Sequence, residues 1–259
     1  DINAITGVRW EDKSLTFDST LSSSLQSVTN ATDQDGTTDN FLNDGRLKVA
    51  VYPAGGSCSQ METFSSKWRS GASSRLMPNT AYAYVELTYD QEKRVTSLTS
   101  GLKFSLEGRK VKEIQSDGTL AAARTYSTNP ADILVDYLMD TKYGGSVPQS
   151  AIDIPSFYSH KLFCDVNVNH TATDGSTVST NRYSTNGVIN TNNQIDQNVS
   201  ALTVGNAGSL TWNYGAFGIV SEKAKASSYS FSEDNIFGQL QVSKVGFDHK
   251  LNEIIVKYE

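Results

Sequence analysis

Strict alternation of apolar and polar residues over positions 81–89 places the strongest constraint on how this chain folds. One face would carry Ala81, Ala83, Val85, Leu87 and Tyr89, and the other Tyr82, Tyr84, Glu86 and Thr88. A period of two residues is typical of a β-strand with one face against a core. The runs 47–51 and 102–106 repeat the alternation, and glycines at 55, 56 and 108 interrupt it. We therefore predict antiparallel β structure from Arg46 onward.

Residues 19–40 contain mainly Ser, Thr, Asn, Asp and Gly and show almost no apolar periodicity. This composition predicts a long loop. Within it, Asp33-Gln34-Asp35-Gly36 and Asp39 offer some of the ligand types of a calcium loop. The regular spacing and the closing glutamate of such a loop are missing. We interpret the segment as a mobile acidic loop that binds no metal.

The pattern changes at Asn129-Pro130, where a helix is predicted to begin. Asn is a preferred N-cap residue, Pro suits the first helical position, and the acidic Asp132 suits the first turn. A single apolar face follows, made of Ile133, Leu134, Tyr137, Leu138 and Thr141. Asp136 is expected on the polar face, and Gly144-Gly145 ends the helix. The helix over 130–142 is therefore predicted to pack on a core.

A second helix is expected from Pro155. Its inward residues are predicted to be Ile154, Phe157, Tyr158 and Leu162. A polar loop at 167–181 and a strand over 182–189 follow. Thr191 and Gln194 have the spacing of a capping box, which predicts a third helix that Gly205 ends.

The segment after this helix is predicted to form a β-hairpin. Leu210, Trp212 and Tyr214 alternate before Gly215, and Phe217 and Ile219 alternate after it. Large aromatic residues at alternate strand positions are more often core residues than a binding platform. We therefore expect Trp212 and Tyr214 to be buried.

The C-terminal residues again show strand patterns. Tyr229 and Phe231 alternate, 240–242 starts another strand, and 254–258 returns after a turn. The economical arrangement places this tail on the first β region. The expected fold class is α+β, mostly β, with residues 1–128 and 224–259 in one β-rich domain and 129–223 inserted as a small α+β domain.

Charge and apolar patterning bear on the possible partners. The formal net charge is −6 over 259 residues, and the nearest approach to a basic cluster is Lys103, Arg109, Lys110 and Lys112. We interpret these four as solvated strand edges and expect no specific nucleic-acid binding. No apolar run reaches the roughly 20 residues of a membrane span, and no signal peptide is recognisable. Because the chain begins at Asp1, we expect it to be a piece of a longer protein.

Reactive groups do not form a known catalytic motif. His160, His170 and His249 have no partners at metal-ligand spacing, so surface or capping roles are expected. Cys58 and Cys164 are expected to be free thiols, although one long-range disulfide stays open. Gly205 and Gly208 follow a helix rather than a strand, which indicates a turn and not a dinucleotide site.

Two carboxylate pairs are candidates for catalysis, Asp132 with Asp136 and Glu233 with Asp234. We interpret both pairs as structural. We therefore predict no catalytic, cofactor-binding or metal-binding residue and no cofactor, and we expect a protein that is not an enzyme.

Several blocks resemble the tip attachment proteins of lambda-type phages, a family of tail tip or baseplate hub proteins. The best match is the run Asn-Pro-Ala-Asp-Ile-Leu at 129–134, followed by 136–138 and by Thr-Lys-Tyr-Gly at 141–144. Shorter blocks in the same order are 81–85, 108–111, 152–153, 157–158, 164–165, 182–189, 208–210, 233–236 and 252–258. The resemblance covers roughly 80–259 and is strongest between 129 and 220.

The resemblance implies a homotrimeric hub with tube-like antiparallel β-barrels and an inserted α+β domain. Its expected location is the distal end of the phage tail in the virion, after assembly in the cytoplasm of the bacterial host. Expected partners are the distal tail protein ring, the tape-measure protein, and a central tail fibre or receptor-binding protein. Full tip proteins are far longer than this chain.

Two other functions stay open on sequence alone. One is a tail-associated cell-wall hydrolase domain, which needs a carboxylate pair in a cleft. The other is a carbohydrate-binding β module, suggested by the Tyr and Trp content. Oligomeric state separates them from the hub, because both of these modules work as monomers.

Overall fold

The computed structural model describes residues 2–56, 77–78, 80–92, 101–230 and 232. Two compact units are distinguished, Asp1–Glu222 and Lys223–Glu259. The described residues of the second unit, 223–230 and 232, form neither helix nor strand. The first unit is mostly β and contains two large hydrophobic cores.

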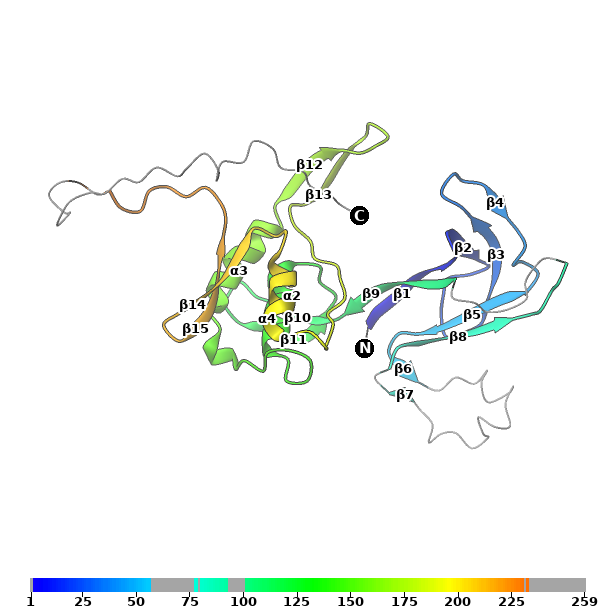
Figure 1. Cartoon of the computed structure of the whole chain (residues 1–259), viewed down its shortest axis with the longest axis horizontal. Coiled ribbons are helices and arrows are strands. Elements are labelled where there is room, and N and C mark those ends of the chain that lie inside the picture. Colours follow the sequence, from blue (N-terminus) through cyan, green and yellow to red (C-terminus); the bar gives the residue numbers. More distant parts are fainter. Residues whose placement is uncertain (1, 57–76, 79, 93–100, 231, 233–259) are drawn as a thin grey trace. The chain divides into compact units, whose positions relative to one another are not determined.

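The first core belongs to an antiparallel sheet (Figure 1). Its strands are β1 (Ile2–Trp10), β2 (Lys13–Phe17), β3 (Gln26–Thr32), β4 (Thr38–Asp39), β5 (Leu47–Tyr52), β8 (Tyr82–Leu87) and β9 (Leu102–Arg109). The order is β8-β5-β3-β2-β1-β9, with β4 paired to β3. The sheet curls into a half-barrel, and the described strands leave β8 and β9 at its two ends.

The sheet bends at β3, which pairs with two different strands on successive parts of its length. Its first residues, Gln26 and Ser27, pair with β5, whereas the residues from Val28 to Thr32 pair with β2. The partners of Thr16 and Phe17 in β3 are Asn30 and Val28, so Thr29 is an extra residue that forms a bulge in β3 beside this change of partner. Such bulges bend a strand and increase its twist. The buried residues enclosed by the curl are Ile5, Val8, Trp10, Leu15, Val28, Ala31, Leu42, Leu47, Val49 and Val51.

The strands predicted from the alternation over 47–51 and 81–89 are confirmed as β5 and β8, which pair in register along their whole length. Strand β8 ends at Leu87, however, and Tyr89, predicted on its inward face, is exposed. The expected loop at 19–40 is wrong, because β3 and β4 lie there. In β3 only Val28 and Ala31 are apolar, and both are fully buried while the polar residues between them are more exposed. Val28 and Ala31 are three positions apart in the sequence, because the bulge lies between them. They therefore do not show the period of two by which a strand is predicted from sequence.

The second core lies among helices and two hairpins (Figure 1). Its elements are β10 (Val111–Ile114), β11 (Leu120–Thr125), α2 (Pro130–Met139), α3 (Ile154–Cys164), α4 (Ile195–Thr203), β14 (Gly208–Asn213) and β15 (Ala216–Ser221). A 3₁₀ turn, η2 (Gln149–Ala151), precedes α3, and the short strands β6 (Gly55–Gly56) and β7 (Met77–Pro78) pair elsewhere. Ile114 of β10 is part of this core, so the core includes residues that precede Asn129.

The predicted start of helix α2 is confirmed, but the helix ends at Met139 and not at 142, and Thr141, predicted on the inward face, is exposed. Asn129 is the N-cap and Pro130 the first helical residue. Leu134, Tyr137 and Leu138 are buried, and Ile133 is partly buried against the same core. In α3, Ile154 and Phe157 are buried as expected, but Leu162 is exposed. His160 and Cys164 are buried instead, and His160 contacts Ser221 of β15.

Three predictions between 165 and 200 are wrong. The expected polar loop forms a hairpin, β12 (Asn167–Thr171) and β13 (Thr177–Asn181), whereas the expected strand over 182–189 is irregular. Nearly every residue of this hairpin is exposed, so burial imposes no alternation on it. Helix α4 is capped by Gln194, whose backbone N–H donates to the side chain of Gln197. The capping box therefore lies three residues after the expected one.

The proposed pairing of the C-terminal tail with the first β region involves strands at 240–242 and 254–258. These positions and Phe231 lie outside the described residues. The assignment of 1–128 with 224–259 to one domain, and of 129–223 to an insertion, stays a prediction.

Candidate functional site

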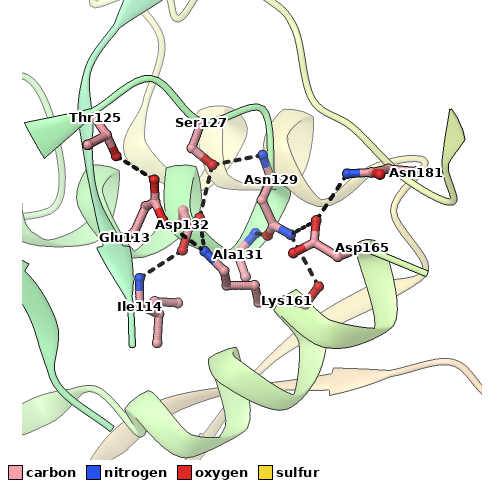
Figure 2. A network of polar contacts seen from close by, with 10 residues as sticks. All are labelled: Glu113, Ile114, Thr125, Ser127, Asn129, Ala131, Asp132, Lys161, Asp165 and Asn181. Carbon is pink, nitrogen blue, oxygen red and sulfur yellow. Dashed lines mark hydrogen bonds and ion pairs between the residues drawn. The ribbon is translucent and has the colours of Figure 1, made fainter. Parts of the chain in front are cut away.

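A polar network surrounds the start of α2 (Figure 2). The side chain of Asp132 is fully buried. Its carboxylate accepts hydrogen bonds from the Ile114 N–H and the Ser127 hydroxyl at 2.9 Å each, and from the Lys161 ammonium at 2.6 Å. Both carboxylate oxygens are engaged, so Asp132 holds β10, the segment before α2, and α3 together.

Asn129 makes a second set of connections from the same end of the helix (Figure 2). Its side-chain oxygen accepts from the Ala131 N–H at 2.9 Å, which caps α2. Its amide nitrogen donates to the Lys161 carbonyl at 3.2 Å and to the Asp165 carboxylate at 2.9 Å. The Asn-Pro-Ala-Asp run therefore joins the beginning of α2 to the end of α3.

Asp136 was expected on a polar face, and this is wrong. It is buried, with its carboxylate 2.8 Å from the Arg124 guanidinium and 3.7 Å from that of Arg109. The hydrophobic pattern of the helix did not show that cations from neighbouring strands would cover this face. Arg109, expected to be a solvated strand edge, is an ion-pair partner here.

Asp140 continues this row of acidic residues one turn further along the helix. Burial alone would raise the pKa of Asp140, but hydrogen bonds from the Tyr143 and Lys142 N–H groups and from Arg109 lower it to about 2. The residues at 132, 136 and 140 are spaced four apart and therefore lie on one side of α2. Each of these carboxylates has a basic side chain as a partner.

The geometry around Asp132 and Asp136 is unlike that of a hydrolytic pair. A hollow of about 100 Å³ lies beside Asp136, whereas sites for small organic ligands span roughly 300–1,000 Å³. Asp132 is separated from solvent altogether. The other pair, Glu233 and Asp234, lies outside the described residues.

His160 is fully buried, so the expected surface or capping role is wrong. Its Nδ1 lies 2.9 Å from the Ser221 hydroxyl and its Nε2 lies 3.5 Å from the Cys164 sulfur. Gly208 packs against the ring so closely that a Cβ there would lie 2.8 Å from it. Sequence spacing alone could have suggested the contact between residues 160 and 164, which lie one helical turn apart.

The thiol of Cys164 does not have the properties of a nucleophile. Burial and the neighbouring Asp165 carboxylate raise its pKa to about 11, against an opposing effect of Arg182. A thiol with such a pKa is protonated at neutral pH, and the thiolate is the reactive form. Cys58 and His249 lie outside the described residues, and His170 is exposed on β12.

The acidic residues at 33–39 form a tight turn between β3 and β4. The Asp33 carboxylate accepts from the N–H groups of Asp35 and Thr37, and that of Asp39 accepts from Lys13 at 2.6 Å. Within the described ranges, no group of three or more His, Cys, Asp or Glu side chains is arranged to hold a metal ion.

Two large aromatic residues lie at the tip of the β14–β15 hairpin. The hairpin and its turn at Gly215 are confirmed, but the expected burial of Trp212 and Tyr214 is wrong. Trp212 is 56% exposed and Tyr214 is fully exposed. Leu210 and Ile219, nearer the strand ends, pack against the second core. The hairpin extends beyond that core, so its tip has no neighbours to cover it among the described residues.

An apolar hollow of about 360 Å³ lies on the half-barrel sheet. It is formed by Ala4, Ile5, Leu21, Ser22, Ser23, Val51, Tyr52, Pro53, Ala54 and Gly55. None of these ten residues carries a charge. The Tyr52 hydroxyl donates to the Ser23 carbonyl at 3.0 Å, and its ring stacks on that of Tyr82 at 4.6 Å between centroids. These contacts fix the wall of the hollow.

Comparison with protein-family models and with curated protein sequences finds no match for this chain. Among the described helices, none has the length and apolar content needed to cross a bilayer.

Proposed function

We propose that this chain is a structural subunit of a phage tail tip, a homotrimeric baseplate hub at the distal end of the tail tube. The observation that carries the proposal is the role of the Asn-Pro-Ala-Asp run. The side chains of Asn129 and Asp132 form hydrogen bonds and an ion pair that connect α2, α3 and β10. The residues of the strongest resemblance thus build a scaffold, which fits an assembly subunit.

The half-barrel supports the tube-like part of the proposal. Its described strands end at β8 and β9, and open sheet edges in a protein are normally covered or paired. A tube would be completed by further strands of this chain or of neighbouring copies. Three copies, each with two tube-like surfaces, would match the six positions of a tail tube.

The remaining partners follow from the proposed position. The subunit would join the distal tail protein ring, close the tube around the tape-measure protein, and carry the central fibre or receptor-binding protein. A net charge of −6 suits a wall past which DNA is ejected during host infection, because an acidic surface does not retain phosphates.

The proposal is tested by the mass and symmetry of the assembled chain. Native mass spectrometry of the purified chain should give a trimer, and images of tail tips should show threefold density at the end of the tube. A monomer, or a sixfold ring, would contradict the hub.

A carbohydrate-binding module is the second candidate, favoured by the exposed Trp212 and Tyr214. Aromatic rings at a surface can stack on sugar rings as they do on other apolar faces. Binding of purified cell-wall glycan by a monomeric chain would support this candidate. A hydrolase would instead lose peptidoglycan cleavage in a Glu233→Gln, Asp234→Asn double variant, a change that should leave a hub's infectivity near the wild-type value.

A further inference from the structure

The tip of the β14–β15 hairpin has an unusual residue in its turn. Tyr214 and Gly215 form a two-residue connection in which both have positive φ, 52° and 80°. Such turns favour Asn, Asp or Gly at the first position, because a bulky side chain is strained there. Tyr214 is nevertheless fully exposed, so no packing within the described chain compensates for the strain. Strain at an exposed aromatic residue points to a role in binding.

The neighbours of Trp212 indicate what kind of partner the tip fits. Trp212 pairs with Phe217 across the hairpin, and the two rings meet edge to face at 4.5 Å between centroids. Leu210 lies on the same strand face, whereas the polar Thr211 and Asn213 alternate to the other face. Asn213 also donates to Thr211 at 3.5 Å. A sugar site needs polar groups that converge beside the ring, so this face suits an apolar protein surface better.

The same chain carries a surface of the complementary kind. The hollow on the half-barrel has about 360 Å³, apolar walls and no charged residue. A buried aromatic anchor in an apolar pocket is the usual form of an interface hot spot.

We propose that the tip formed by Trp212 and Tyr214 inserts into this hollow on a second copy of the chain. The inference rests on the proposed function, which requires several copies side by side, and it names the contact between them. The contact joins two different surfaces, so each copy still has a free tip or a free hollow after pairing. Repetition of one such contact closes a ring when the rotation permits it.

The area of the contact fits a ring better than an isolated pair. Two aromatic side chains bury roughly 150–250 Å² each, well below the ~1,000 Å² expected of a stable interface. The tip would be the central anchor of a wider contact, and ring closure would reinforce it. The pairwise affinity should therefore be much lower than the stability of the closed assembly.

Two variants of the full chain test the two surfaces separately. The first is Trp212→Ala with Tyr214→Asn, where Asn suits the positive φ of the turn. The second is Ala54→Arg, which places a charge at the exposed Ala54 of the hollow. Matched controls are Tyr89→Asn, a change of another exposed tyrosine, and Thr173→Arg in the turn after β12. Circular dichroism checks that every variant stays folded, and Tyr214→Asn alone serves if the double change unfolds the hairpin.

The assembly state is measured by sedimentation over a range of concentrations. Each variant should raise the concentration at half-assembly by at least about 30-fold, because the loss of a hot-spot residue weakens binding by about that factor. Both controls should assemble at the same concentration as the wild type. In an equal mixture of the two variants, the tip variant supplies an unaltered hollow and the Ala54→Arg variant supplies an unaltered tip. At high concentration it should form heterodimers and stop there, because no further contact can form.

The outcomes separate this inference from the hub itself. A wild-type trimer with unchanged assembly in both variants would overturn the tip-and-hollow contact and leave the hub intact. A wild-type monomer would remove the hub and the contact together. Loss of binding to cell-wall glycan in the tip variant, with assembly unchanged, would overturn the contact in favour of a sugar ligand.

Discussion

The ammonium group of Lys161 lies 2.6 Å from the carboxylate of Asp132, whose side chain is completely buried. This ion pair links the second half of α3 to the first turn of α2. The carboxylate also accepts from the Ile114 N–H and the Ser127 hydroxyl, so its charge is compensated on all sides. The pair is the centre of the scaffold from which the function is proposed.

Removal of Lys161 alone should be strongly destabilising. Lys161→Met leaves the buried Asp132 charge without its cation, and breaking a buried pair in this way costs about 3–5 kcal/mol. The free energy of unfolding, measured by urea denaturation, should fall by about that amount. The double variant Lys161→Met with Asp132→Asn should be less destabilised than the sum of the single changes. Additive losses would show that the two side chains do not interact.

Leu134 should contribute through packing alone. Its side chain is fully buried in the second core, so Leu134→Ala should cost about 2–4 kcal/mol. Leu162 is 52% exposed on α3, and Leu162→Ala is the matched control with a small expected effect. Thermal melts of both variants measure the difference. Equal melting midpoints would mean that the inward face of α2 is solvated.

The stability of the chain should depend on Asp140 in acid. Its pKa is lowered from an ordinary 3.8 to about 2 in the folded state, so the unfolded chain binds the proton more readily. The stabilisation is complete above pH 3.8 and is lost as the pH falls toward 2. The contribution is on the order of 2 kcal/mol. Asp140→Asn should flatten the stability curve between these pH values, and an unchanged curve would assign the acid sensitivity to other groups.

Gly208 should be intolerant of any side chain. A Cβ there would lie 2.8 Å from both His160 and Ile219, and both neighbours are buried. Gly208→Ala should therefore cost about 1–3 kcal/mol through overpacking. Gly187 has nothing within 4 Å of an added Cβ, so Gly187→Ala is the control. If both variants lose a similar free energy of unfolding, the destabilisation of Gly208→Ala does not come from its contact with His160.

Local sequence signals predicted the elements that have strong pattern or turn chemistry. Asn129-Pro130 predicted the start of α2, and the Tyr214-Gly215 turn was predicted from the alternation on either side. Strands β5 and β8 were predicted because their apolar residues alternate on one buried face.

The elements that were missed depend on contacts distant in sequence. Strand β3 is held by pairing with β2 and β5 and carries only two apolar residues. The burial of Asp136 depends on Arg109 and Arg124 from other elements. That of His160 depends on Ser221, which lies 61 residues away. Periodicity within a single element contains none of this information.

The exposure of Trp212 and Tyr214 was missed for a different reason. Alternation indicates that residues share a strand face, but it does not say how far the neighbouring core extends along that face. Leu210 contacts the core, whereas Trp212, two residues further on, is beyond it. The strain at Tyr214 becomes visible only with the backbone angles of the turn.

Imaging of the purified chain in its assembled state tests the central proposal most directly. Single-particle images should show a closed ring of three copies with threefold symmetry, with the β-rich sheets lining its lumen. A chain that stays monomeric at every concentration, or that forms a sixfold ring, would contradict the assignment to a trimeric tail tip hub.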